Sequence, residues 1–200
     1  NGRWAFKNAL KIAEGHKMGV NVVKDIVKES VKQNLSSLTI YAFSSENWKR
    51  PKTEVTAIKN LVVDAINDQV PELKEQKVRL KFFGHTNDFG KKVIDKIRYA
   101  EEKTYIKNSK LDLNVALGYG GKQDLVDIVK SISANVLDKK IKLNNINEGM
   151  LHDASSVPVK EIDLLIRTGG DKRISNFLLY QIAYAEIIFV LLNIGQAFFL

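Results

Sequence analysis

Cysteine is absent from the 200-residue sequence. This absence excludes disulfide bonds, zinc–cysteine sites and thiol catalysis, so a bound metal must be held by oxygen or nitrogen atoms. The start of the chain also lacks the apolar core and the small-residue cleavage site of a signal peptide. The absence of cysteine fits a reducing compartment, and we expect the protein in the cytoplasm.

Proline is scarce, with three residues, and no repeat or Pro/Gly/Ser-rich linker divides the chain. With 44% apolar and 27% charged residues, the composition is that of a folded domain rather than a disordered or collagen-like chain. Two hundred residues can bury one core of useful size. We therefore expect a single domain over residues 1–200.

Long apolar runs are rare as well, and only residues 177–200 raise the question of a membrane span. This stretch carries a single charge, Glu186, and is interrupted by Gln181, Asn193 and Gln196. A carboxylate at the centre of a bilayer costs about 2.5–3.5 kcal/mol even on lenient insertion scales. The sequence instead predicts a buried helix followed by a core strand near residues 187–192.

Positive charge is plentiful but unevenly distributed. The formal net charge is +8, and residues 1–110 carry 22 Lys and Arg against 13 Asp and Glu. A basic half can attract nucleic acid, anionic lipid or phosphorylated small molecules, and the sum alone does not choose among them. Many of the lysines recur at helical spacing opposite apolar positions, which indicates a solvated surface, and no nucleic-acid module is present.

Helix and strand patterns alternate along the chain. Apolar residues at three-to-four spacing predict helices over residues 17–33, from about residue 53 to Pro71, near 89–106 and after Gly121. Short β-branched and aromatic runs predict strands at 38–43, 78–83, 113–117, 163–166 and 187–192. The predicted fold class is α/β, a single domain with a mainly parallel central β-sheet flanked by helices.

Ligands of such sheets bind beyond the carboxyl ends of the strands, which here are followed by three polar loops. The loop at Arg167–Asn176 contains two adjacent glycines, two arginines, a lysine and the hydroxyl of Ser175. Adjacent glycines let backbone N–H groups converge on an anion, and arginine forks bind phosphate oxygens in pairs. This loop predicts a phosphate site, although Ser175 is also suited to cap a following helix.

The other two loops are less specific. In the first, at Ser44–Pro51, Ser44 and Asn47 supply hydrogen bonds, Arg50 supplies a cation, and Trp48 supplies an apolar surface. A site and a solvated turn both fit this loop. In the second of these two, at Gly118–Lys122, the glycines around Tyr119 indicate packing and turn geometry.

Two further residues stand near these loops. His16 stands beside Gly15, ahead of the helix predicted over residues 17–33, where its ring is suited to bind phosphate, transfer a proton or simply pack. Glu186 lies between two apolar segments, where an unpaired carboxylate would be costly. It is expected either to pair with a cation or to ligate a hard metal such as Mg²⁺.

Five motifs occur in one order along residues 1–190, and together they resemble the cis-prenyltransferases, most closely the undecaprenyl diphosphate synthases. They are Asn1-Gly2-Arg3-Trp4-Ala5, Gly15-His16-Lys17, the run from Tyr41 to Pro51, Gly118-Tyr119-Gly120-Gly121, and the run from Asp163 to Gly170 that continues to Glu186. The family's first motif begins two places earlier with a catalytic Asp. The sequence also departs from the family at Ile12 and after about residue 190.

The resemblance implies a Mg²⁺-dependent transferase that condenses isopentenyl diphosphate units onto farnesyl diphosphate. Its product would be a long-chain, undecaprenyl-type diphosphate that serves as a cell-wall lipid carrier. It also implies a homodimer that contacts the inner face of the membrane peripherally through its product and binds no nucleic acid. A non-catalytic partner subunit or an inactive remnant of the same fold is the rival hypothesis.

The resemblance also implies roles for individual residues. Ser44, Asn47 and His16 would be catalytic, and Glu186 would bind the metal. The substrate-binding residues would be Asn1, Gly2, Arg3, Trp4, His16, Ser44, Ser45, Glu46, Trp48, Arg50, Glu54, Arg167, Arg173, Ile174 and Ser175. Among these, Arg167, Arg173 and Ser175 would hold isopentenyl diphosphate, whereas Gly2, Arg3 and His16 would hold the allylic diphosphate.

Overall fold

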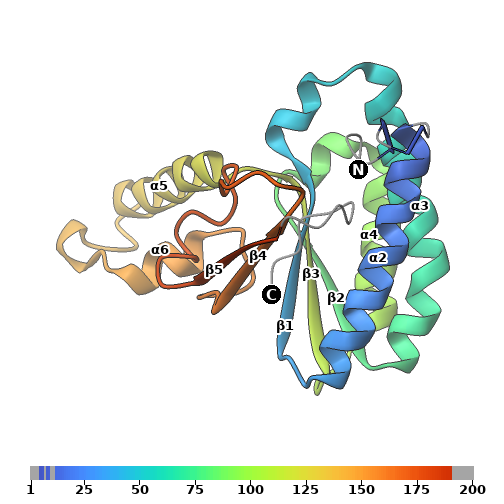
Figure 1. Ribbon diagram of the computed structural model, residues 1–200. Coiled ribbons are helices and arrows are strands. Elements are labelled where there is room, and N and C mark those ends of the chain that lie inside the picture. Colours follow the sequence, from blue (N-terminus) through green and yellow to red (C-terminus); the bar gives the residue numbers. More distant parts are fainter. Residues whose placement is uncertain (1–4, 7, 10–11, 191–200) are drawn as a thin grey trace.

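The computed structural model describes residues 5, 6, 8, 9 and 12–190 (Figure 1). Its longer elements alternate as the sequence predicts. In chain order they are α2 (Ile12–Lys32), β1 (Ser37–Ser44), α3 (Lys52–Glu75), β2 (Val78–Phe83), α4 (Lys91–Thr104), β3 (Leu111–Tyr119), α5 (Gly121–Leu137), α6 (Glu148–Ala154), β4 (Leu164–Thr168) and β5 (Glu186–Val190). Short 3-10 turns lie at Ser45–Lys49, Thr86–Phe89 and Leu143–Asn145.

All described strand pairs are parallel, which confirms the predicted α/β class. β3 is the centre of a three-stranded sheet in the order β1-β3-β2, and β4 pairs with β5 in a second sheet. Figure 1 shows α2, α3 and α4 on one side of the larger sheet, with α5, α6 and the β4–β5 sheet on the other. The strands we expected in one sheet therefore form two within the described residues, because no described strand joins β1 to β4.

The larger core lies between β1-β3-β2 and the three helices. Its buried side chains include Val27 of α2, Ile58 and Ile66 of α3, Ile97 of α4 and Leu113 of β3. These helices form because apolar side chains recur every three to four residues and make one buried face. The prediction that the second of them ends at Pro71 is wrong: α3 continues to Glu75, since burial of Val70 and Leu73 around Pro71 offsets one lost backbone hydrogen bond.

A second core joins the two sheets. Phe177 is fully buried, and its ring stacks on Tyr41 of β1 with centroids 4.1 Å apart. Tyr119 and Phe83 meet the same cluster edge-on, and Leu165 of β4 closes it. Residue 119 thus contributes packing, as its place between glycines indicated.

Residues 177–190 correct one prediction. They form a series of turns and then β5, rather than a buried helix and a core strand. Leu178 is buried with φ +44°, a left-handed backbone that interrupts a helix. Ile187 and Ile188 of β5 are 42% and 47% exposed. Over the described residues no helix is sufficiently long and apolar to cross a membrane, and residues 191–200 lie outside the described part.

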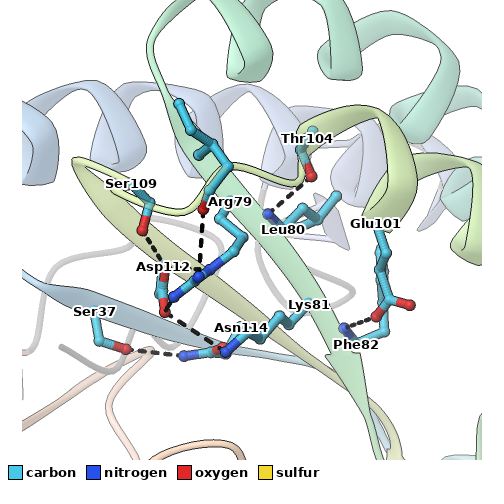
Figure 2. Close-up of polar contacts among 11 residues, drawn as sticks. Ser37, Arg79, Leu80, Lys81, Phe82, Glu101, Thr104, Ser109, Asp112 and Asn114 are labelled. Atoms are coloured by element: carbon cyan, nitrogen blue, oxygen red, sulfur yellow. Dashed lines mark hydrogen bonds and ion pairs between the residues drawn. The ribbon is translucent and has the colours of Figure 1, made fainter.

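Polar side chains connect the strands of the larger sheet near their N-terminal ends (Figure 2). Arg79 of β2 grips Asp112 of β3 through two nitrogens, with N–O distances of 2.9 and 2.5 Å, and Ser109 donates to the same carboxylate. On the outer edge of β2, the Leu80 N–H donates to Thr104 Oγ1 (3.0 Å) and the Phe82 N–H to Glu101 Oε1 (2.8 Å). Side chains of α4 therefore satisfy backbone donors at this edge.

Gly84, which ends β2, offers a stability test. Its φ is +97°, and a Cβ there would lie 2.5 Å from the Leu117 carbonyl oxygen. Gly84→Ala is expected to lower the free energy of unfolding by about 2 kcal/mol or more, because backbone strain of about 1–3 kcal/mol adds to the collision. Gly90→Ala is the matched control, with φ +87° but nothing within 4 Å of the added Cβ. Equal losses in urea denaturation of the two variants would contradict the collision.

Candidate active site

Hydrogen bonds from Arg167 hold together the loop after β4, at Arg167–Asn176, which the sequence predicts to bind phosphate. Arg167 Nη1 donates to Ser175 Oγ (2.6 Å) and to the Arg173 carbonyl, and its Nη2 donates to Asp171 (3.2 Å). Arg173 also pairs with Asp171 at 3.0 Å, while its own side chain is largely exposed. The structure thus brings together the predicted residues Arg167, Arg173 and Ser175 around an aspartate.

Two details of this loop differ from the alternatives considered above. Ser175 does not cap a helix, because the chain turns after it, with φ values of +51° at Ser175 and +61° at Asn176. Its hydroxyl instead accepts a hydrogen bond from Arg167. Ile174 is partly buried and packs against the second core, so it anchors the loop.

A hydrogen bond between Ser44 and Asn47 fixes the start of the loop after β1. The Ser44 N–H donates to Asn47 Oδ1 (3.1 Å), which fixes the amide of Asn47 at the strand end. Ser45 lies against Gly120 so closely that a Cβ on the glycine would be 2.3 Å from Ser45 Oγ. Glu46 accepts a hydrogen bond from Asn176 Nδ2 (2.7 Å).

Trp48 faces the larger core rather than the loops. Its ring lies 4.9 Å from that of Phe43 and 4.8 Å from that of Phe89, centroid to centroid. The Lys59 amine sits 5.0 Å from the Trp48 ring, within the range of a cation–π contact.

His16, Arg50 and Glu54 form a second polar group, at the start of α2 and α3. His16 Nε2 lies 3.5 Å from Glu54 Oε1, and Arg50 Nη1 donates to the same oxygen at 2.6 Å. Burial lowers the pKa of His16 below its ordinary value, although its contact with Glu54 opposes this. Burial acts to raise the pKa of Glu54, but the Arg50 hydrogen bond and charge outweigh it and hold the pKa below its usual range.

An apolar cavity of about 170 Å³ begins at this group. It runs between α2, α3 and the sheet and is lined mainly by aliphatic side chains, with His16 among the few polar ones. Lys24, Lys28 and Glu72 also line it, and Glu72 bridges both lysines at 2.6 and 3.1 Å. The arrangement suits a molecule with an anionic head and a hydrocarbon tail.

The metal prediction finds little support in the described geometry. Glu186 is exposed at the first position of β5, paired in register with Leu164. Residues 5, 6, 8, 9 and 12–190 contain no group of three or more His, Asp or Glu side chains that could hold a metal ion. These residues therefore do not by themselves fit a magnesium site. The predicted substrate residues Asn1, Gly2, Arg3 and Trp4 lie outside the described residues.

Sequence reasoning missed Asn176 and Asp171. Asn176 contacts the loops after both β1 and β3: Nδ2 donates to Glu46, Oδ1 accepts from the Lys122 N–H (2.9 Å), and its carbonyl accepts from the Gly121 N–H (2.7 Å). Its place at the end of the loop after β4 was the only available signal. Asp171 forms ion pairs with both Arg167 and Arg173. The spacing of these residues in the sequence did not reveal that one carboxylate contacts both side chains.

His16 leads to a prediction on pH. Because its pKa is lower in the folded protein, the unfolded chain binds the extra proton first, so stability is expected to fall as the pH drops below about 6.5. His16→Gln removes this titration and should reduce the loss of unfolding free energy between pH 7.5 and 5.5. Urea denaturation at both pH values measures it, with His85→Gln, at an exposed histidine, as the control. An unchanged pH dependence in His16→Gln would refute the assignment.

Solved structures with the same architecture define the class. The crystal structure of lavandulyl diphosphate synthase from Lavandula x intermedia, in complex with dimethylallyl diphosphate, superposes with a TM-score of 0.92 and 28% identity, over 96% of this chain and 84% of that one. A "probable undecaprenyl diphosphate synthase" from Campylobacter jejuni superposes with a TM-score of 0.76 and 34% identity, over 86% and 80% of the two chains. The fold is that of these prenyl diphosphate synthases.

Sequence comparison narrows the class to a family. The family model described as "Putative undecaprenyl diphosphate synthase" matches residues 1–193, and the chain belongs to this family of prenyltransferase enzymes. A ditrans,polycis-undecaprenyl-diphosphate synthase of Buchnera aphidicola, named as farnesyl-diphosphate specific, is 43% identical over 94% of this chain and 75% of its own length. An isoprenyl transferase of Clostridium perfringens is 42% identical over 96% and 76%. The predicted resemblance and enzyme class are confirmed.

Proposed function

We propose that this chain condenses isopentenyl diphosphate units in cis onto farnesyl diphosphate and makes a long-chain polyprenyl diphosphate of the undecaprenyl type. The observation that carries the proposal is the apolar cavity that begins at His16, beside Arg50 and Glu54. A diphosphate head would lie at this polar end, where Arg50 and the His16 ring supply N–H donors, and the hydrocarbon would enter the cavity. The names of the relatives support the choice of farnesyl diphosphate.

The reaction asks for two anion sites and a place for one proton. The allylic carbon–oxygen bond breaks, diphosphate leaves, the isopentenyl double bond attacks the allylic carbon, and a proton leaves the new chain. We assign the isopentenyl diphosphate to Arg167, Arg173 and Ser175, because guanidinium groups stabilise negative charge on phosphate oxygens. His16 is neutral near pH 7, since burial lowers its pKa, and its ring N–H is suited to donate to the allylic diphosphate.

The loop after β1 would lie where the proton leaves the new chain. The Asn47 amide oxygen already accepts from the Ser44 N–H, so the cap fixes the direction of the amide group. We assign Ser44 and Asn47 to the region where the proton leaves. The further residues that the proposal assigns to substrate binding are Asn1, Gly2, Arg3, Trp4, Ser45, Glu46, Trp48, Arg50, Glu54 and Ile174; of these, Trp48 and Ile174 would act by packing beneath their loops.

Magnesium belongs to the same proposal, as an ion that would offset the charge of the diphosphates. Glu186 is the one carboxylate that we assign to it, and a single carboxylate does not make a metal site. The steps above therefore use protein groups alone.

The proposal includes a homodimer in the cytoplasm that touches the membrane only through its product, a lipid carrier for the cell wall. Support for the dimer comes from apolar side chains that are exposed on α5 and β5. They are Leu125, Val126, Val129, Ile187 and Ile188. Exposed apolar side chains on these two elements are suited to burial against a second subunit.

The test is transfer of radiolabelled isopentenyl diphosphate onto farnesyl diphosphate in the presence of Mg²⁺, with product length read by reverse-phase chromatography. Labelled products that grow by five carbons per step are the expected result. Saturable binding of isopentenyl diphosphate without any transfer would favour the non-catalytic partner or remnant. Absence of both binding and transfer by the folded protein would refute the proposed function.

A further inference from the structure

Asn176 bonds to two loops that are remote from it in the sequence. Its Nδ2 donates to Glu46 Oε1 at 2.7 Å, across 130 positions. Its Oδ1 accepts from the Lys122 N–H at 2.9 Å, and its carbonyl oxygen accepts from the Gly121 N–H at 2.7 Å. One residue thus links the loop after β1, the start of α5, which follows β3, and the loop after β4.

These loops belong to different sheets. β1 and β3 lie in the larger sheet, whereas β4 pairs with β5. The Glu46–Asn176 bond therefore spans from the loop that carries Ser44 and Asn47 to the loop that carries Arg167 and Ser175. A shift between the sheets would move one set of reacting groups relative to the other.

The surroundings of Asn176 are shaped to this contact. A Cβ on Gly120 would lie 2.9 Å from Asn176 Nδ2, so the glycine leaves the space that the amide group uses. The backbone of Asn176 has φ +61°, a conformation that Asn adopts more readily than most residues. Burial acts to raise the pKa of Glu46, but its hydrogen bonds, with that from Asn176 foremost, hold the pKa below its usual range.

We propose that Asn176 is a positioning residue that sets the distance between the isopentenyl diphosphate loop and the Ser44–Asn47 loop. The inference rests on the proposed function, because it names what aligns the two halves of that site. Asn176 acts through its neighbours: it holds Glu46 on one side and the chain next to Ser175 on the other. Misplacement of reacting groups by about 1 Å can cost about a hundredfold in rate.

The decisive variant is Asn176→Asp, which keeps the size of the side chain and its tolerance of positive φ but replaces the donor to Glu46 with a second carboxylate. We expect kcat to fall at least tenfold, with a KM for farnesyl diphosphate within threefold of wild type, since His16 and Arg50 lie in a separate group.

Asn67→Asp is the matched control, as an exposed asparagine on α3 whose Oδ1 accepts from Lys96 and whose replacement keeps that acceptor. A second readout does not need turnover: amide hydrogen exchange at Lys122, whose N–H loses its acceptor Asn176 Oδ1, should accelerate at least tenfold in Asn176→Ala. If wild type transfers no isoprenyl group, the proposed function fails while exchange still decides whether Asn176 joins the loops. Unchanged kcat in Asn176→Asp overturns the positioning role, as does unchanged exchange at Lys122 in Asn176→Ala.

Discussion

Replacing Arg167 with alanine is expected to lower kcat/KM for isopentenyl diphosphate by about a hundredfold or more. The Arg167 side chain is only 11% exposed and donates to Ser175, Asp171 and the Arg173 carbonyl. Hydrogen bonds to charged groups are each worth about 1.5–3 kcal/mol, and each 1.4 kcal/mol is about tenfold in affinity. The loss of two such bonds gives the expected effect, which initial rates over a range of isopentenyl diphosphate concentrations will measure.

Arg167→Lys separates the charge of this residue from its shape. Lysine keeps the cation but lacks the planar fork that reaches several oxygens at once, so we expect an intermediate loss of about tenfold. Arg98→Ala, at an exposed position on α4, should leave kcat and the KM for isopentenyl diphosphate unchanged. A lysine variant as active as wild type would show that charge alone suffices, and full activity of Arg167→Ala would remove the loop from the substrate site.

Phe177→Ala is expected to have the largest effect on stability, a loss of about 3–5 kcal/mol. Removal of a buried phenylalanine costs about this much, since apolar area is lost and a cavity remains. The ring is fully buried and touches Tyr41 from the larger sheet and Tyr119 at the end of β3. Total stabilities are about 5–15 kcal/mol, so the variant would lose a large share, to be measured by urea denaturation.

Two variants make this prediction specific. Phe177→Leu keeps part of the apolar volume and should cost less than half as much. Tyr184→Ala, at a side chain that is 98% exposed, should change the free energy of unfolding by less than about 0.5 kcal/mol. A loss below about 1 kcal/mol in Phe177→Ala would show that the two sheets do not depend on this ring.

Prediction from sequence succeeded where one helix or strand carries the signal. The apolar spacing of α2 and the β-branched run of β1 are local patterns, and the structure confirms both. It failed for residues 177–185, because an apolar run does not reveal whether it folds as a helix or as buried turns. The positive φ of Leu178, which decides the matter, follows from packing between the two sheets.

The site was predictable in the same uneven way. Arg167, Arg173 and Ser175 lie within nine residues, so their common loop was visible in the sequence. The role of Asn176 depends on Glu46, and nothing in the local sequence indicates that these residues meet. His16 and Glu54 come from different helices, and their contact depends on how α2 packs beside α3.

The side chains along the outer edge of β2 also affect whether this protein aggregates through its sheet. An open strand edge is a template on which another chain can add a strand. Because Thr104 and Glu101 already accept the N–H groups of Leu80 and Phe82, an incoming strand would have to displace both side chains before it could pair there. Strand addition, and with it fibre growth from this edge, is therefore opposed by the native hydrogen bonds of α4.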